Sequence, residues 1–200
     1  MIRDFTQLLE NEYVRRFYDT WQELCIGDDL PARKAVRLQD FAPFAPDLLI
    51  YQMIAPGHLH CRLMGSHVSD RVKIYSPDVN WLDLVAPDMR EAGSIWWGNL
   101  FSTPCAGVMQ FSTGFINGTS RASQALLLPV RQGPDEIQLI GLSNASGVYA
   151  AEEARDQLII SHDCFQTKYI DVGFGLPAGV PEREDHKVLS DEIWNIIFEE

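Results

Sequence analysis

Two short segments of the chain bring together residue types that enzymes use as nucleophiles and general bases. Ser66 stands beside His67, and His162 is followed by Asp163 and Cys164. A catalytic serine or cysteine needs a base within hydrogen-bond reach and donors for the oxyanion, and neither segment carries the Gly-x-Ser-x-Gly turn that helps to supply them. The sequence also has no glycine-rich phosphate loop. We therefore expect no catalytic site and interpret the protein as a non-enzyme.

The histidines raise the alternative of a metal or haem site. In the strand-like run that contains His58, His60 and Cys61, alternation puts the two histidines on one face and the cysteine on the other. Two histidines leave a zinc site one or two protein ligands short. His67 and His162 are haem-ligand candidates by residue type only, because neither belongs to a haem-binding motif. We predict no metal site, and the sequence does not specify a cofactor.

The most specific binding signal is the segment 107–131, in which two strand-like runs flank Asn117-Gly118. An Asn-Gly pair is typical of a tight β-hairpin turn because both residues tolerate positive φ. A two-residue loop would pair Ile116 with Thr119 and bring one set of alternating side chains to a common face. The side chains of that predicted face are Met109, Phe111, Thr113, Ala122, Gln124 and Leu126. An apolar surface with one amide suits the base of a small-molecule pocket.

Gln124 is the amide of this predicted face. A buried amide that lacks a hydrogen-bond partner costs about 1–3 kcal/mol, so Gln124 needs a partner. That partner is either a bound molecule or a neighbouring side chain or water, and buried polar groups are usually paired within the protein. If a ligand is the partner, Gln124→Leu should abolish the retention of a co-purified molecule and leave the fold intact.

Aromatic residues of the helix-like segment 88–101 complete the predicted pocket. Trp96 and Leu100 belong to the apolar stripe of this helix. The neighbouring Trp97 cannot face the same core as Trp96 from a single helix, so it must occupy a pocket, a loop contact or an interface. We expect Trp97 and Phe101 to line the ligand site.

The elements that must position these residues follow from the spacing of apolar side chains. We expect, in chain order, an amphipathic helix at 5–25, strands at 48–54 and 59–64, a short helix after Gly65, helix 88–101, the hairpin, a central strand at 137–143, an extended segment at 166–174 and a short helix after Ser190. This order is typical of an α/β domain with an antiparallel sheet.

Composition limits the setting and the partners of the protein. The 200 residues are 46% hydrophobic and carry a net charge of −12, which disfavours nucleic-acid and anionic-membrane binding. The four cysteines stand far apart, and no apolar leader or run of about 18 apolar residues is present. We predict a cytoplasmic protein with reduced thiols.

Five short motifs follow one another between residues 28 and 147. They are Leu30-Pro-Ala-Arg33, Phe41-Ala-Pro43, Cys61-Arg62-Leu63-Met64-Gly65-Ser66, Leu126-Leu-Leu-Pro129-Val130 and Ile140-Gly-Leu142. In their order and spacing they resemble the single-domain bacterial PAS family, which is found mostly in alphaproteobacteria. The segment 73–80 differs from the Gly-Arg-Asp-Leu-Thr-Gly-like segment that is usual at this place in the family.

The resemblance implies a PAS-like α+β domain at 28–147, with a five-stranded antiparallel sheet and flanking helices. Helical extensions are expected at 1–27 and 148–200, and they either pack on this sheet or form a homodimer or docking surface. The resemblance also implies a non-catalytic sensory or regulatory protein that binds a small molecule or a protein partner and signals through protein contacts. The alternatives are an interaction module with a filled core and a small cofactor-using enzyme.

Overall fold

The described part of the chain folds around a six-stranded antiparallel sheet with the strand order β2-β1-β5-β4-β3-β6. This computed structural model describes residues 5–27, 29–74, 79–85, 87, 89–115, 120–134, 136–145 and 159–178. The strands are β1 (Leu48–Ala55), β2 (His58–Met64), β3 (Ala106–Phe115), β4 (Ser120–Gly133), β5 (Glu136–Ala145) and β6 (Ile159–Ile170). The PAS-like sheet expected from the sequence is confirmed, with one strand more than the five expected.

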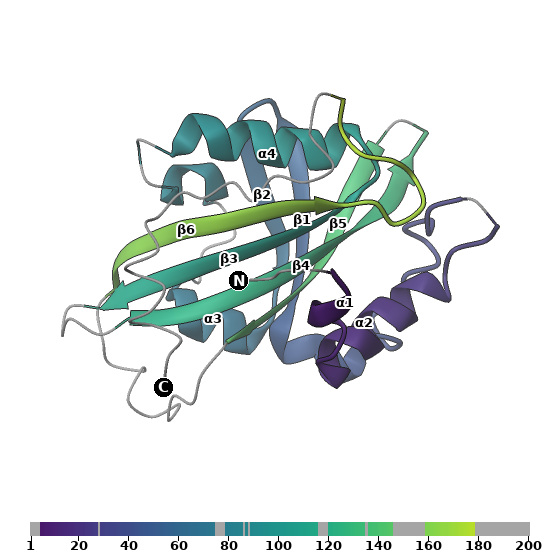
Figure 1. Cartoon of the computed structure of the whole chain (residues 1–200), viewed down its shortest axis with the longest axis horizontal. Coiled ribbons are helices and arrows are strands. Elements are labelled where there is room, and N and C mark those ends of the chain that lie inside the picture. The colour runs from purple at the N-terminus through teal and green to yellow at the C-terminus, as the bar shows by residue number, and fades with distance from the viewer. Residues whose placement is uncertain are drawn as a thin grey trace.

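The additional strand, β6, pairs with the outer edge of β3 along the whole length of that strand. The pairing runs from Ala106 opposite Ile170 to Phe115 opposite Ile159. Figure 1 shows β6 and β3 side by side at one edge of the sheet. Part of the predicted extension at 148–200 is therefore a sheet strand, while the helix expected after Ser190 lies outside the described residues.

The N-terminal segment forms two helices where the sequence predicts one. The helices are α1 (Phe5–Leu8), α2 (Glu12–Gln22), η1 (Ala42–Asp47), α3 (Ser66–Val72), η2 (Trp81–Leu84) and α4 (Arg90–Ser102). The side chain of Asn11 accepts hydrogen bonds from the backbone N–H groups of Tyr13 (3.0 Å) and Val14 (3.3 Å). Asparagine is a strong N-cap residue, so the chain starts a new helix at this point.

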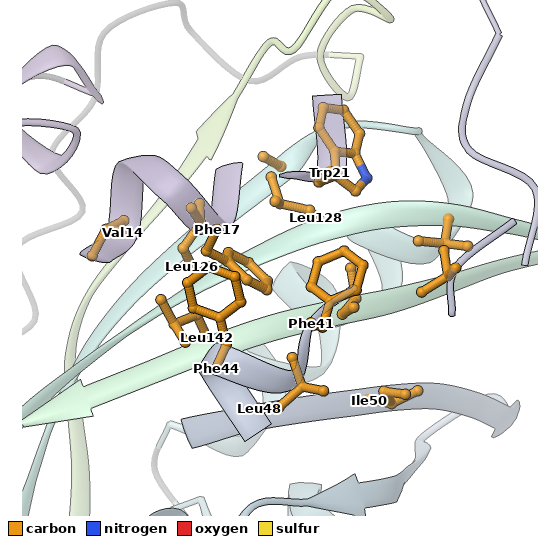
Figure 2. Close-up of a cluster of buried hydrophobic side chains, with 14 of the residues drawn as sticks. Val14, Phe17, Trp21, Phe41, Phe44, Leu48, Ile50, Leu126, Leu128 and Leu142 are labelled. Atoms are coloured by element: carbon orange, nitrogen blue, oxygen red, sulfur yellow. The ribbon is translucent and has the colours of Figure 1, made fainter. Parts of the chain in front are cut away.

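Helix α2 covers one face of the sheet with its apolar side. Phe17 and Trp21 are 0% and 1% exposed, and Figure 2 shows both pointing from α2 toward Leu126 and Leu128. The indole N–H of Trp21 donates a 2.8 Å hydrogen bond to the carbonyl oxygen of Pro129 on β4. The N-terminal helix therefore packs on its own sheet, where the sequence left open a homodimer surface.

The opposite face of the sheet packs against α3, η2 and α4. Alternation along β1 divides the two cores, since Leu48 belongs to the α2 side and Leu49 to the α4 side. In Figure 1, α2 and α4 lie on opposite sides of the sheet. Gly107 lets α4 approach closely, because a Cβ atom there would lie 2.7 Å from Leu100 and 3.0 Å from Trp96. None of the helices in the described parts of the chain is long and apolar enough to cross a membrane.

The β3–β4 hairpin forms, but its register differs by one residue from the predicted one. Met109 pairs with Ala125 and Phe111 with Ser123, where the two-residue loop would have paired them with Leu126 and Gln124. The predicted turn at Asn117-Gly118 lies outside the described residues. Because side chains alternate between the faces of a strand, a shift of one residue moves every β4 side chain to the other face.

Candidate ligand-binding pocket

A cavity of about 80 Å³ lies between the sheet and the helices α3, η2 and α4. Its lining residues are Leu49, Tyr51, Val68, Val72, Ile74, Trp81, Leu84, Val85, Trp97, Met109, Phe111, Ala125 and Ser143. Four strands and three helical segments contribute to this set, so the cavity depends on the complete domain. Concave, mainly apolar cavities with a few polar groups are the usual form of small-molecule sites.

Three aromatic side chains form one wall of the cavity. The ring of Tyr51 meets Trp81 edge to face at 5.5 Å and packs against Trp97 at 5.0 Å. Such contacts fix ring positions and contribute beyond simple burial. Contacts among the three rings therefore order the wall independently of a ligand.

The sequence predicts that Trp96 faces the core and that Trp97 occupies a pocket, a loop contact or an interface, and in the structure Trp97 lines the cavity. Both side chains are buried. They are 6% and 5% exposed, and their rings meet edge to face at 5.0 Å. Trp96 turns toward β6, where its ring lies 6.1 Å from that of Tyr169, whereas Trp97 turns toward Tyr51 on β1. Helix α4 can bury both residues because Trp96 packs on β6 while Trp97 packs on β1.

The polar groups of the cavity wall are few and include the hydroxyls of Tyr51 and Ser143. Tyr51 is 3% exposed, and burial raises the pKa of its hydroxyl well above the ordinary value. Within the described part of the chain, that hydroxyl makes no hydrogen bond. Tyr51 therefore presents a neutral group that can donate one hydrogen bond and accept another.

Three of the predicted site residues, Trp97, Met109 and Phe111, line the cavity. Phe101 is half-buried and packs against the hydrophobic core on the α4 side of the sheet, but it does not line the cavity. Thr113 lies opposite Arg121 on β4, and its side chain is outside the described set.

The predicted site residues of β4 face the other way. Leu126 belongs to the core beneath α2, and Ala122 and Gln124 alternate onto the same face. The side-chain oxygen of Gln124 accepts a hydrogen bond from the side-chain amide of Gln110 at 3.2 Å. The single predicted face is thus wrong for these three residues, and the partner of Gln124 is a neighbouring side chain.

Sequence reasoning missed the contributions of β1, α3, β5 and the pocket side of β4. Tyr51, Val68, Val72, Ala125 and Ser143 were assigned no part in the site, although all line the cavity. A signal was present for Tyr51, because the predicted strand 48–54 is apolar on both faces and must therefore be covered on both. The correct β3–β4 register would have identified Ala125.

Cys61 and Cys105 do not offer a reactive thiol at the cavity. Cys61 is 6% exposed and Cys105 is fully buried, and burial raises the pKa values of their thiols to about 12 and about 11. A thiol must lose its proton to act as a nucleophile or metal ligand. Among the described residues, no group of three or more His, Cys, Asp or Glu side chains could hold a metal ion.

The raised thiol pKa of Cys61 predicts a loss of stability at alkaline pH. The thiol ionises near its ordinary value of 9.0 in the unfolded chain but only near 12 in the folded protein. Its contribution is therefore fully present below pH 9 and is lost as the pH rises toward 12, by about 1.4 kcal/mol per pH unit. Urea denaturation at pH 8, 9 and 10 measures this slope. Cys61→Ala should make the slope shallower, and an unchanged slope would contradict the assignment.

Comparison with known protein families identifies the kind of domain that this chain forms. A family model described as "PAS domain" matches residues 9–143, well over half of the 200-residue chain. The matched range contains helix α2, strands β1 to β4 and every residue that lines the cavity. A search of curated proteins finds no match.

Proposed function

Because this chain belongs to the PAS domain family, whose members are generally non-catalytic sensory and regulatory modules, we propose that it is a sensor that binds a small molecule in the cavity beneath α4. The observation that carries the proposal is the apolar cavity of about 80 Å³ between the sheet and α3, η2 and α4. Burial of apolar ligand surface in such a space is favourable by about 25 cal/mol per Å².

The lining supports a ligand that is small, neutral and mainly apolar. No charged side chain lines the cavity in the described part of the chain, and a charged ligand would have to lose its hydration without compensation. An engineered apolar cavity of about 150 Å³ binds benzene, so the present volume suits a molecule of about one ring or less. The hydroxyls of Tyr51 and Ser143 can each meet one polar group of the ligand.

The output of the sensor, in this proposal, passes through contacts with a protein partner or with a second copy of the chain. A ligand shifts the balance between two arrangements of the helices only if it binds one of them better. A cytoplasmic setting is part of the proposal and is supported by the free, widely spaced Cys25, Cys61 and Cys105. We also propose that the protein belongs to the single-domain bacterial PAS group that its motifs resemble.

Titration with benzene tests this function, and we expect benzene to bind in the cavity. The indole N–H signals of Trp81 and Trp97 should shift in two-dimensional NMR spectra when benzene is added, because both residues line the cavity. The signal of Trp21 should stay in place, since its N–H is bonded to Pro129 on the opposite side of the sheet. Native mass spectrometry of freshly purified protein would detect a natural ligand in the same site.

Filling the cavity should remove this binding. Ala125 is 2% exposed and lines the cavity from β4, so Ala125→Phe should lower the benzene affinity at least tenfold. Gln124→Leu is the matched control, because it changes the next residue of β4 on the opposite face, and it should leave benzene binding unchanged. Wild-type protein that neither carries a ligand nor binds benzene would favour the filled-core interaction module instead.

A further inference from the structure

A buried arginine lies between the cavity and the end of the sheet. Arg71 is 8% exposed and sits on α3 next to Val72, which lines the cavity. Its Nη2 donates to the carbonyl oxygen of Ser143 at 2.6 Å and lies 3.4 Å from the hydroxyl of the same residue. Its Nη1 donates to Oδ1 of Asp47 at 2.9 Å. Arg71 thus connects a cavity residue on β5 with the carboxylate that precedes β1.

The same carboxylate is bound from the other side of the sheet by helix α2. The hydroxyl of Tyr13 donates to Oδ2 of Asp47 at 3.3 Å and lies 3.4 Å from the carbonyl oxygen of Pro43, and the Nδ1 of His67 also lies 3.3 Å from Oδ2. Burial and the neighbouring Asp47 raise the pKa of Tyr13 to about 12, so the hydroxyl keeps its proton at neutral pH. Its ring packs against Phe44 of η1 at 5.2 Å between centroids.

The segments that hold this chain of contacts are in close backbone contact as well. Gly65 precedes α3, and its N–H donates to the carbonyl oxygen of Leu48 at 2.8 Å. A Cβ atom on Gly65 would overlap the backbone carbonyl groups of Ala45 and Pro46 in η1. The start of α3 is thus in tight backbone contact with η1. A displacement of α3 must therefore also move Asp47, the last residue of η1.

From this geometry we propose that the series Ser143–Arg71–Asp47–Tyr13 couples the cavity to helix α2. The proposal rests on the proposed function, because it needs a ligand in the cavity. A ligand that contacts Ser143 or displaces α3 through Val72 changes the hydrogen bonds of Arg71, and Arg71 shares Asp47 with Tyr13. Occupancy on one face of the sheet is thereby transmitted to the helix on the other face. Tyr13, Asp47 and Arg71 act here as positioning residues.

Hydrogen exchange with benzene as the probe tests this coupling. In the full-length wild-type protein, saturating benzene should change the amide exchange rates of α2 (Glu12–Gln22) at least threefold. Tyr13→Phe removes the bond to Asp47 and keeps the ring that packs on Phe44. The benzene affinity of this variant, measured from the Trp81 and Trp97 indole signals, should be within twofold of the wild-type value. The amide exchange rates of α2 should no longer change when benzene is added.

A second tyrosine on the same helix supplies the matched control. Tyr18 packs against Phe5 and Trp21 and has no contact with Asp47, so Tyr18→Phe should retain the exchange response. A response that persists in Tyr13→Phe, or wild-type protein that binds benzene without a change in α2, overturns the coupling and leaves the sensor proposal standing. Wild-type protein that neither carries a co-purified ligand nor binds benzene overturns the sensor proposal and the coupling together.

Discussion

Replacing Phe17 with alanine is expected to lower the free energy of unfolding by about 3–5 kcal/mol. Phe17 is 0% exposed and lies at the centre of the core beneath α2. Its ring meets those of Phe41 and Phe44 at 5.7 Å and 5.4 Å, and Figure 2 shows all three gathered over the sheet. Truncation removes these contacts and leaves a space that the surrounding rings and strands can fill only in part. Urea denaturation followed by circular dichroism measures the loss.

The preceding residue on the same helix provides the control. Arg16 is exposed, so Arg16→Ala should change the free energy of unfolding by no more than about 0.5 kcal/mol. If α2 served only as a surface for a second copy, Phe17→Ala would leave the monomer's stability near that of Arg16→Ala and would change self-association instead. That outcome would contradict the packing described here.

The α2 core shows what the spacing of apolar residues can and cannot predict. The spacing of apolar residues predicts an amphipathic helix at 5–25, and Val14, Phe17 and Trp21, which recur there at three- and four-residue steps, are all buried. This spacing did not predict what the apolar side would pack against, because periodicity identifies an apolar face and says nothing about its partner. The helix break at Asn11 was also missed, although asparagine before a helical run is an N-cap signal.

The error in the hairpin register has a similar physical cause. Leu126, Leu127 and Leu128 are all buried, since β4 is a central strand with both faces covered. A run of consecutive apolar residues gives no alternation from which the inward-facing set can be read. The register then depended wholly on the assumed length of the turn, and a difference of one residue exchanged Leu126 for Ala125 as the partner of Met109.

The burial of Trp96 on α4 depends on β6, a strand that the sequence indicates only weakly. Residues 159–165 include Ser161, His162 and Asp163, which do not form an apolar strand pattern. An edge strand is held largely by its backbone bonds to one neighbour, so its side chains are free to be polar. Without β6 the sheet would offer Trp96 no Tyr169 to pack against. The sequence indicated only the second half of this strand, within the extended segment at 166–174.

Gly65→Ala is the second substitution for which we expect a large effect, a loss of about 3 kcal/mol in the free energy of unfolding. The added methyl group would overlap the backbone carbonyls of Ala45 and Pro46, and backbone atoms cannot move aside as a flexible side chain can. Either η1 or the start of α3 must shift. Thermal and urea denaturation of the purified variant would measure the loss.

A second glycine separates this steric effect from the general effect of adding a methyl group. Gly98 lies within α4, and a Cβ atom added there would have open space within 4 Å, so Gly98→Ala should stabilise the protein by about 0.5–1 kcal/mol through helix propensity. Equal effects of the two substitutions would show that the contact between η1 and α3 is not tight.

The same Gly65→Ala substitution should also weaken benzene binding, and this links stability to the proposed function. Helix α3 begins directly after Gly65 and places Val68 and Val72 against the cavity, so a shift of its first turn moves two lining residues together. We expect at least a tenfold loss of benzene affinity in Gly65→Ala under conditions where the variant remains folded, and no loss in Gly98→Ala. Full affinity in folded Gly65→Ala would mean that the cavity tolerates displacement of α3, and α3 could not then carry a signal from the cavity to Asp47.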